Sequence, residues 1–112
     1  MSESTNNGEV IISDFWNRKI RLTFNRKEHI EVDHPEMKGM ISLIESTLKA
    51  PDEVRISNSD SNVELFYKLV NVPIVGSKYI CLVIKNLRID FFLITAYFTD
   101  KIKKGEIKWK KE

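Results

Sequence analysis

The feature that most constrains the fold of this chain is a change in hydrophobic period near Pro51. In residues 36–49, directly before this proline, apolar residues recur with helical spacing. After it, they alternate with polar residues at a period of two, as they do in strands. Four such segments follow, at residues 53–57, 63–70, 79–85 and 90–99. Short links rich in turn-forming residues join them, and such links favour an antiparallel meander because parallel neighbours need a long crossover.

Two helices are predicted ahead of these strands. Asn25, with Glu28 three residues later, has the spacing of a capping box and predicts a short helix over 26–32. Pro35 ends this helix, because the residue before a proline disfavours the helical conformation, and it suits the first turn of a second helix over 36–49. An apolar stripe of helical period marks the core side of that helix: Met37, Met40, Ile41, Ile44 and Leu48.

The segment ahead of the helices predicts a hairpin of two short strands, at 9–13 and 20–24. Residues 1–8 lack the basic and apolar regions of a secretion signal and are expected to form a disordered lead-in. The chain of 112 residues is long enough for one domain, assigned to 9–112. We therefore predict an α+β fold in which the N-terminal hairpin and two helices pack on a four-stranded antiparallel sheet.

Composition favours a cytoplasmic globular protein. The hydrophobic fraction is 42% and the charged fraction is 30%, and no apolar run approaches the roughly 18 residues that span a bilayer, so no membrane contact is expected. The single cysteine, Cys81, excludes an intramolecular disulfide and fits a reducing compartment. It lies in an apolar run, where a small buried hydrophobe is a commoner role than a nucleophile.

Basic residues are clustered although the net charge is only +2. Residues 18–27 contain five Lys and Arg residues and no acid, and residues 101–112 contain six lysines and two glutamates. Such clusters can attract a polyanion. A lysine-rich tail also keeps a protein soluble, so both interpretations stay open for the C-terminal cluster.

The strand at 90–99 contains Thr95 and Tyr97, which share one face because side chains alternate along a strand. Apolar alternation in the other strands predicts Arg55, Glu64 and Lys68 on this same face, away from the helices. Cations beside hydroxyls and aromatic rings suit phosphate and base binding. An antiparallel sheet can also keep a polar face for solvent alone, which leaves a structural role for these residues open.

The same alternation places several apolar residues on the polar face. They would need cover from the N-terminal hairpin or from a second copy of the chain, which makes a homodimer one expectation. These residues are Phe66, Val70, Val83, Phe91 and Leu93.

His29 is a further candidate for chemistry, because imidazole suits proton transfer; a surface or packing role is the ordinary alternative. His29 and His34 would lie about 140° apart on a helix, so one helix cannot direct both to one ion. The sequence has no Walker, G-x-G-x-x-G or G-x-S-x-G motif. We therefore expect neither a metal nor a cofactor.

Short motifs follow a recognisable order between Ile20 and Trp109. They are His29-Ile30, His34-Pro35-Glu36, Thr47-Leu48 with Pro51-Asp52, Arg55, Leu65-Phe66-Tyr67-Lys68, Thr95-Ala96-Tyr97, and Lys104-Gly105-Glu106 with Trp109. This order resembles the barnase–EndoU–colicin–RelE-like (BECR) nucleases, in particular their small phage- and bacteria-borne group.

The resemblance implies a compact α+β fold and metal-independent RNA cleavage, in which the ribose 2′-hydroxyl attacks the adjacent phosphate and leaves a 2′,3′-cyclic phosphate. This reaction needs a base, an acid and positive charge. By resemblance, His29 would be the acid or base. Arg55, helped by Lys68, would hold the phosphate, while Thr95 and Tyr97 would position phosphate or base.

The implied protein is a toxin-like or RNA-processing endoribonuclease, with RNA and an inhibitor or antitoxin protein as its expected partners. Barnase pairs a glutamate with a histidine, and no such pair is obvious here. Glu64 is a weaker candidate for the base, so the second proton carrier stays open. The alternative is a non-catalytic RNA- or protein-binding module of the same fold.

Overall fold

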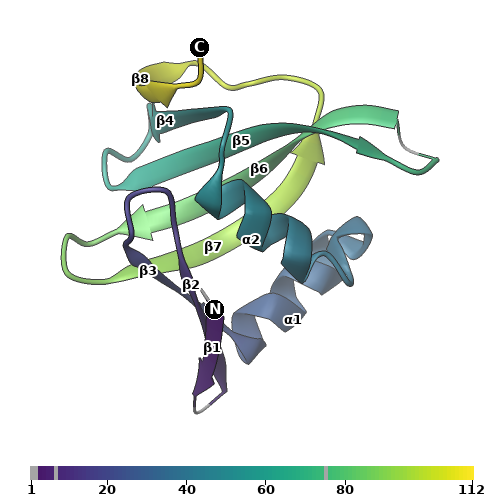
Figure 1. Cartoon of the computed structure of the whole chain (residues 1–112), viewed down its shortest axis with the longest axis vertical. Helices are drawn as coiled ribbons and strands as arrows, with labels where there is room; N and C mark the ends of the chain where they lie inside the picture. The colour runs from purple at the N-terminus through teal and green to yellow at the C-terminus, as the bar shows by residue number, and fades with distance from the viewer. Residues whose placement is uncertain (1–2, 7, 75) are drawn as a thin grey trace.

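The computed structural model describes residues 3–6, 8–74 and 76–112. The described strands form one mixed sheet of eight, in the order β1-β2-β3-β7-β6-β5-β4-β8. The strands are β1 (Glu3–Asn6), β2 (Glu9–Ser13), β3 (Lys19–Thr23), β4 (Glu53–Ser57), β5 (Val63–Val72), β6 (Gly76–Asn86), β7 (Phe91–Thr99) and β8 (Gly105–Lys110). Helix α2 (Ile41–Lys49) lies across one face of the sheet, and helix α1 (Phe24–Asp33) packs against β7 and β3 (Figure 1).

The expected four-stranded antiparallel sheet is wrong. Strands β4 to β7 do form an antiparallel meander. However, β3 adds to β7 in parallel, with Ile20 opposite Phe91 and Arg21 opposite Phe92, and β8 adds to β4. The N-terminal hairpin therefore extends the sheet and does not pack on it. These pairings satisfy backbone N–H and C=O groups that the edges of β7 and β4 would otherwise expose. The residue pattern of a strand does not reveal which other strand it will pair with.

The N-terminal lead-in also differs from the expectation of disorder. Residues Glu3–Asn6 form β1, which pairs with β2 in antiparallel register. Residues 1, 2 and 7 lie outside the described part of the chain.

Both helices begin at different residues from those expected. Helix α1 begins at Phe24, and its cap is Thr23, whose Oγ1 accepts a hydrogen bond of 3.0 Å from the Arg26 amide. The second helical segment is divided into a 3₁₀ turn, η1 (Pro35–Met37), and α2. Gly39, with φ of +76°, lies between them in the left-handed region, which ends one helical segment before the next begins.

The main core lies between α2 and the sheet. One row across four strands defines the side of the sheet that we call the helix face: Val54, Phe66, Leu82 and Ala96, all at 0% exposure. We call the opposite side the open face. A smaller cluster of Val63, Leu65, Tyr67 and Cys81 is buried there.

Strand β5 has the opposite phase to the one expected. Phe66 faces α2, so Glu64 and Lys68 also belong to the helix face, and the prediction that they share a face with Thr95 is wrong. Residues 63–67 are all buried, so both faces of this strand are covered. A strand that is buried on both faces lacks a clear alternation of apolar and polar residues, and its phase cannot be read from the sequence. Phase in such a segment is decided by the neighbouring strands.

A register shift between Val83 and Ile84, opposite β7, changes the phase of the first half of β7. Leu93 therefore faces the main core at 1% exposure, and Ile94 packs against the open-face cluster. One inserted residue moves every preceding side chain to the other face. The apolar dimer surface expected from the sequence is accordingly absent from the described open face, because Phe66, Val70, Phe91 and Leu93 belong to the main core.

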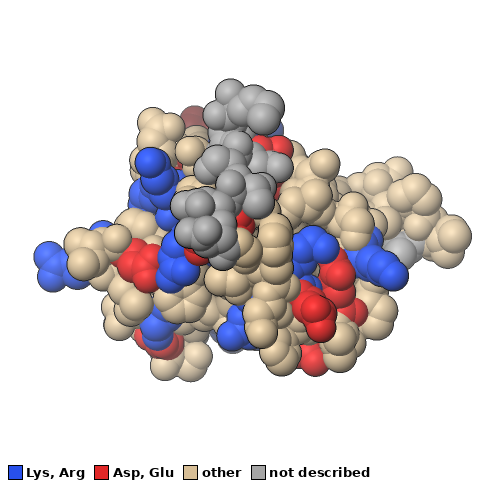
Figure 2. All heavy atoms as spheres, turned by 90° about the horizontal axis from the view of Figure 1, so that it is seen from below, with Lys and Arg blue, Asp and Glu red and all other residues tan. Residues whose placement is uncertain are grey.

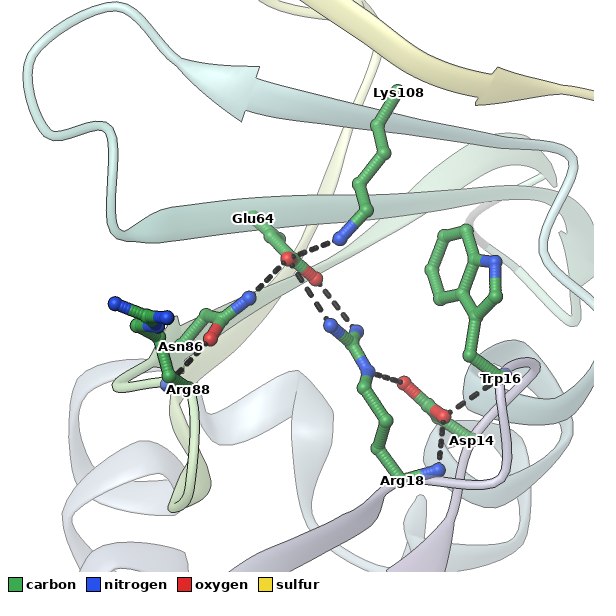
Figure 3. Close-up of polar contacts among 7 residues, drawn as sticks. All are labelled: Asp14, Trp16, Arg18, Glu64, Asn86, Arg88 and Lys108. Carbon is green, nitrogen blue, oxygen red and sulfur yellow. Dashed lines mark hydrogen bonds and ion pairs between the residues drawn. The ribbon is translucent and has the colours of Figure 1, made fainter.

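A buried ion network joins the N-terminal hairpin to the sheet (Figure 3). The Glu64 carboxylate is 1% exposed and accepts two hydrogen bonds from Arg18, at 2.6 and 3.1 Å. Lys108 of β8 and Asn86 of β6 donate to the same carboxylate at 2.6 and 2.8 Å. Burial alone would raise the pKa of Glu64, but the three donors lower it to about 2.

We predict that Glu64→Gln lowers the free energy of unfolding by about 3 kcal/mol, because it removes the buried charge that Arg18 shares with Lys108 and leaves Arg18 with Asp14 alone. Urea denaturation checks this. Lys49→Ala removes a half-exposed ion pair with Glu45, one turn away on α2, and should cost at most about 0.5 kcal/mol. Equal losses in the two variants would show that the buried network contributes no more than a surface pair.

The low pKa of Glu64 also predicts a pH dependence. The folded state binds this proton more weakly than the unfolded state, so the stabilisation is complete above about pH 5 and disappears as the pH falls toward about 2. The difference in unfolding free energy between wild type and Glu64→Gln should therefore shrink over that range. A difference that stays constant with pH would contradict the assignment.

Candidate functional site

The open face carries a groove of about 430 Å³. Its floor is apolar and formed by Val63, Leu65 and Val83. Thr95 and Tyr97 of β7 line it, and two loops form its rim, one at residues 57–60 and one containing Lys103 and Lys104. An apolar floor with a polar rim is the usual composition of a ligand site.

Cross-strand register places three polar side chains, two tyrosines and a cysteine, in one row at the groove. Tyr67, Cys81 and Tyr97 are direct partners on β5, β6 and β7. The Cys81 thiol is fully buried, and both tyrosine hydroxyls affect its pKa. Burial, as the largest effect, raises the pKa of this thiol, which fits the role of a small buried hydrophobe.

Both tyrosine hydroxyls remain protonated at neutral pH. Burial raises the pKa of Tyr67 to about 12, and burial together with the Cys81 thiol raises the pKa of Tyr97 further. Tyr97 therefore offers an aromatic ring and a neutral hydroxyl to the groove and does not supply a negative charge.

The backbone of Lys103 is held on both sides. Its amide donates a hydrogen bond of 3.1 Å to the Tyr67 hydroxyl, and its carbonyl accepts one of 3.4 Å from Arg55. Arg55 also donates to the carbonyl of Gly105 and to the Glu53 carboxylate. These bonds fix the loop that directs Lys103 toward the groove, with its Nζ 5.9 Å from the centre of the Tyr97 ring.

Gly105 explains the close approach of this loop to the sheet. A Cβ atom at this position would collide with the carbonyl oxygen of Ile56. Only glycine lets the two backbones lie this close, which gives the Lys104-Gly105-Glu106 motif a structural reason.

His34 is the histidine that contacts this site. It lies at the C-cap of α1, and its ring centre is 5.5 Å from that of Tyr97, at an interplanar angle of 30°. Its Nδ1 is 3.8 Å from the Glu36 carboxylate. From the sequence, His34 was weighed as a metal ligand and counted in the His34-Pro35-Glu36 motif, but it was given no catalytic role. Its position directly before Pro35, where the helix must end, was the signal that could have singled it out.

The structure brings together some of the residues predicted from the sequence and separates others. Thr95 and Tyr97 line the groove, and Arg55 lies on the same face but is bound to Glu53 and to the loop backbone. Lys68 lies on the helix face, where its Nζ donates 2.9 Å to the Ala50 carbonyl at the end of α2. His29 lines a separate shallow hollow on α1 with Asn25, Glu28 and Val32.

Charge around the molecule is local and mixed. On the side seen in Figure 2, Lys and Arg are interspersed with Asp and Glu. Within the described ranges, no group of three His, Cys, Asp or Glu side chains is placed to hold a metal ion. No helix in those ranges is both long and apolar enough to cross a membrane.

Comparisons with models of known protein families, with curated proteins and with solved structures gave no match. The chemistry and geometry of the open face are therefore the basis for assigning a function.

We predict that Tyr67→Phe loosens the loop at residues 101–105, because it removes the acceptor of the Lys103 amide. The loss of one such hydrogen bond should cost about 1 kcal/mol. Amide hydrogen exchange checks this, with faster exchange expected at Lys103. Tyr79→Phe removes a hydroxyl from the same face but leaves this hydrogen bond in place, so it should not change that exchange rate; equal protection in both variants would contradict the role of Tyr67.

Proposed function

We propose that this chain is a metal-independent endoribonuclease whose substrate binds in the groove of the open face. The proposal depends mainly on one observation: the side chains of His34 and Lys103 both lie close to the ring of Tyr97. The His34 ring centre lies 5.5 Å from the Tyr97 ring centre, and the Lys103 Nζ lies 5.9 Å from it. A proton carrier and a fixed positive charge thus flank a surface on which a base or ribose can pack.

Several properties of the groove favour RNA as the substrate. Single-stranded RNA is recognised by aromatic stacking, by cations along its backbone and by hydrogen bonds to exposed base edges. Tyr97 supplies the ring, Lys103 and Lys104 supply charge, and the loop at 57–60 supplies polar groups at the rim. The resemblance to small phage- and bacteria-borne nucleases supports the same class.

The proposed reaction is an internal transesterification. His34 removes the proton from the ribose 2′-hydroxyl, a bond forms between O2′ and phosphorus, and the bond from phosphorus to O5′ breaks. The Lys103 ammonium stabilises the phosphorane charge and donates a proton to the departing O5′. The products are a 2′,3′-cyclic phosphate and a 5′-hydroxyl. His34 then releases the proton it accepted to solvent, and Lys103 takes one up from solvent, so both side chains return to their starting states.

This proposal changes three roles suggested by the sequence. His34 takes the role first considered for His29. Arg55 acts through Lys103, because its guanidinium is engaged by Glu53 and by loop carbonyls. Lys68 has no part in it, since it lies on the helix face.

A non-catalytic RNA-binding module is the second candidate, and one observation favours it. Two carboxylates on the open face already have partners: Glu53 is bound by Arg55, and Asp60, which lines the groove, is bound by Lys85. Glu64 is buried on the helix face. A carboxylate base of the barnase kind is therefore not supplied by these three residues.

We predict that the wild-type protein cleaves single-stranded RNA in the presence of EDTA and leaves 2′,3′-cyclic phosphate ends. His34→Ala and Lys103→Ala should each lower kcat by at least about 100-fold, the usual contribution of a general acid or base. Gel analysis of a labelled oligonucleotide, with the ends identified by mass spectrometry, checks this.

Lys49→Ala is the control, because it removes the same charge as Lys103→Ala but lies on α2, on the helix face of the sheet. It should cleave RNA like wild type. His29→Ala is the decisive comparison. If it abolishes cleavage while His34→Ala does not, the proposed proton carrier is wrong. If wild type binds RNA without cleaving it, the binding module is the better description.

A further inference from the structure

A second hollow lies at the edge of β7 that pairs with β3, whereas the groove lies toward β6 and β5. It has a volume of about 140 Å³ and is lined by Arg21, Thr23, Arg26, Phe92 and Leu93. Register places Phe92 opposite Lys85 and Lys85 opposite Val63, and Val63 forms part of the groove floor. Phe92 therefore belongs to the open face, as the groove does.

The two arginines of this hollow differ in their availability. Arg21 is bound by Asp90 and Glu9, and its guanidinium lies 5.6 Å from the centre of the Phe92 ring. Arg26 is exposed, and among the described residues no carboxylate forms an ion pair with its guanidinium. Arg26 thus provides a free positive charge beside an aromatic ring whose orientation is held by Arg21.

We propose that this hollow is a second RNA subsite, in which Arg26 binds a backbone phosphate and Phe92 packs against a ribose or base. The inference rests on the proposed binding of RNA to the open face. It gives a role to part of the basic cluster at residues 18–27, which the groove leaves unused.

The separation of the two hollows determines the length of RNA that can reach both. Phe92 and Tyr97 are five residues apart on β7, roughly 16 Å at about 3.3 Å a residue. Helix α1 packs along β7, with Arg26 in its first turn beside the second hollow and His34 at its end beside Tyr97. A nucleotide has about twice the backbone bonds of an amino acid residue, so the span corresponds to about two or three steps from one nucleotide to the next, and three or four nucleotides are needed to cover it. A dinucleotide at the groove would not reach Arg26.

The test measures binding of 2′-O-methyl oligonucleotides, which lack the attacking hydroxyl, by fluorescence anisotropy. Wild type should bind a hexanucleotide more tightly than a dinucleotide. Arg26→Ala should weaken hexanucleotide binding about fivefold to tenfold, lower the slope of log K against log salt by about 0.7, and leave dinucleotide binding unchanged. Arg26→Lys should retain the slope, and Lys49→Ala should behave as wild type.

Helix α1 should survive the substitution, since Thr23 caps the backbone amide of Arg26 and not its side chain. Hexanucleotide affinity and salt slope that do not change in Arg26→Ala would overturn the second subsite. If wild type still cleaves RNA in that case, the proposed ribonuclease stands. If the hexanucleotide binds through Arg26 but RNA is not cleaved, the subsite stands and the ribonuclease does not; absence of any binding overturns both.

Discussion

The buried carboxylate of Glu64 is the group on which the arrangement of this sheet depends. Glu64 lies on the interior strand β5. Its hydrogen-bond donors are Arg18 from the turn between β2 and β3, Asn86 from β6 and Lys108 from β8. A carboxylate in such a place must be fully paired, because an isolated buried charge is very costly. Arg18 is held in turn by Asp14, and its guanidinium lies 4.9 Å from the Trp16 ring and 4.7 Å from the Phe91 ring. The network thereby fixes where the hairpin meets β7.

The two faces of the sheet are stabilised in different ways, and this difference creates the candidate site. The helix face is closed by α2 and by apolar packing. The open face has only a small buried cluster, and its rim is held by hydrogen bonds from Arg55 and Tyr67 to the backbone of one loop. A loop fixed by its backbone can present a lysine without tying up the ammonium group. Pre-organised charge of this kind is what a phosphoryl transition state requires.

Helix α1 connects the two hollows of the open face. Because β3 pairs with only the first residues of β7, the rest of that edge is available to the helix that follows β3. The same parallel contact that enlarged the sheet therefore positions Arg26 and His34. Arg26 and His34 therefore lie at opposite ends of α1, and both are beside β7. A four-stranded meander without β3 would not place the helix along this edge.

The local elements could be predicted from the sequence: a helix over 26–32, which the structure extends to 24–33, the strands of the meander, and Thr95 and Tyr97 on a shared face. These depend on periodicity and on proline and glycine chemistry, which act over a few residues. The sequence did not determine the phase of β5, where every residue from 63 to 67 is buried, nor the register shift opposite β7, which moves Leu93 into the core. The edges joined by β3 and β8, the position of His34 against Tyr97, and the engagement of Arg55 by the loop depend on contacts between residues far apart in the chain. These features are set by long-range contacts, because a pairing between distant segments depends on which apolar groups it buries and which backbone hydrogen bonds it completes, and a local residue pattern contains neither.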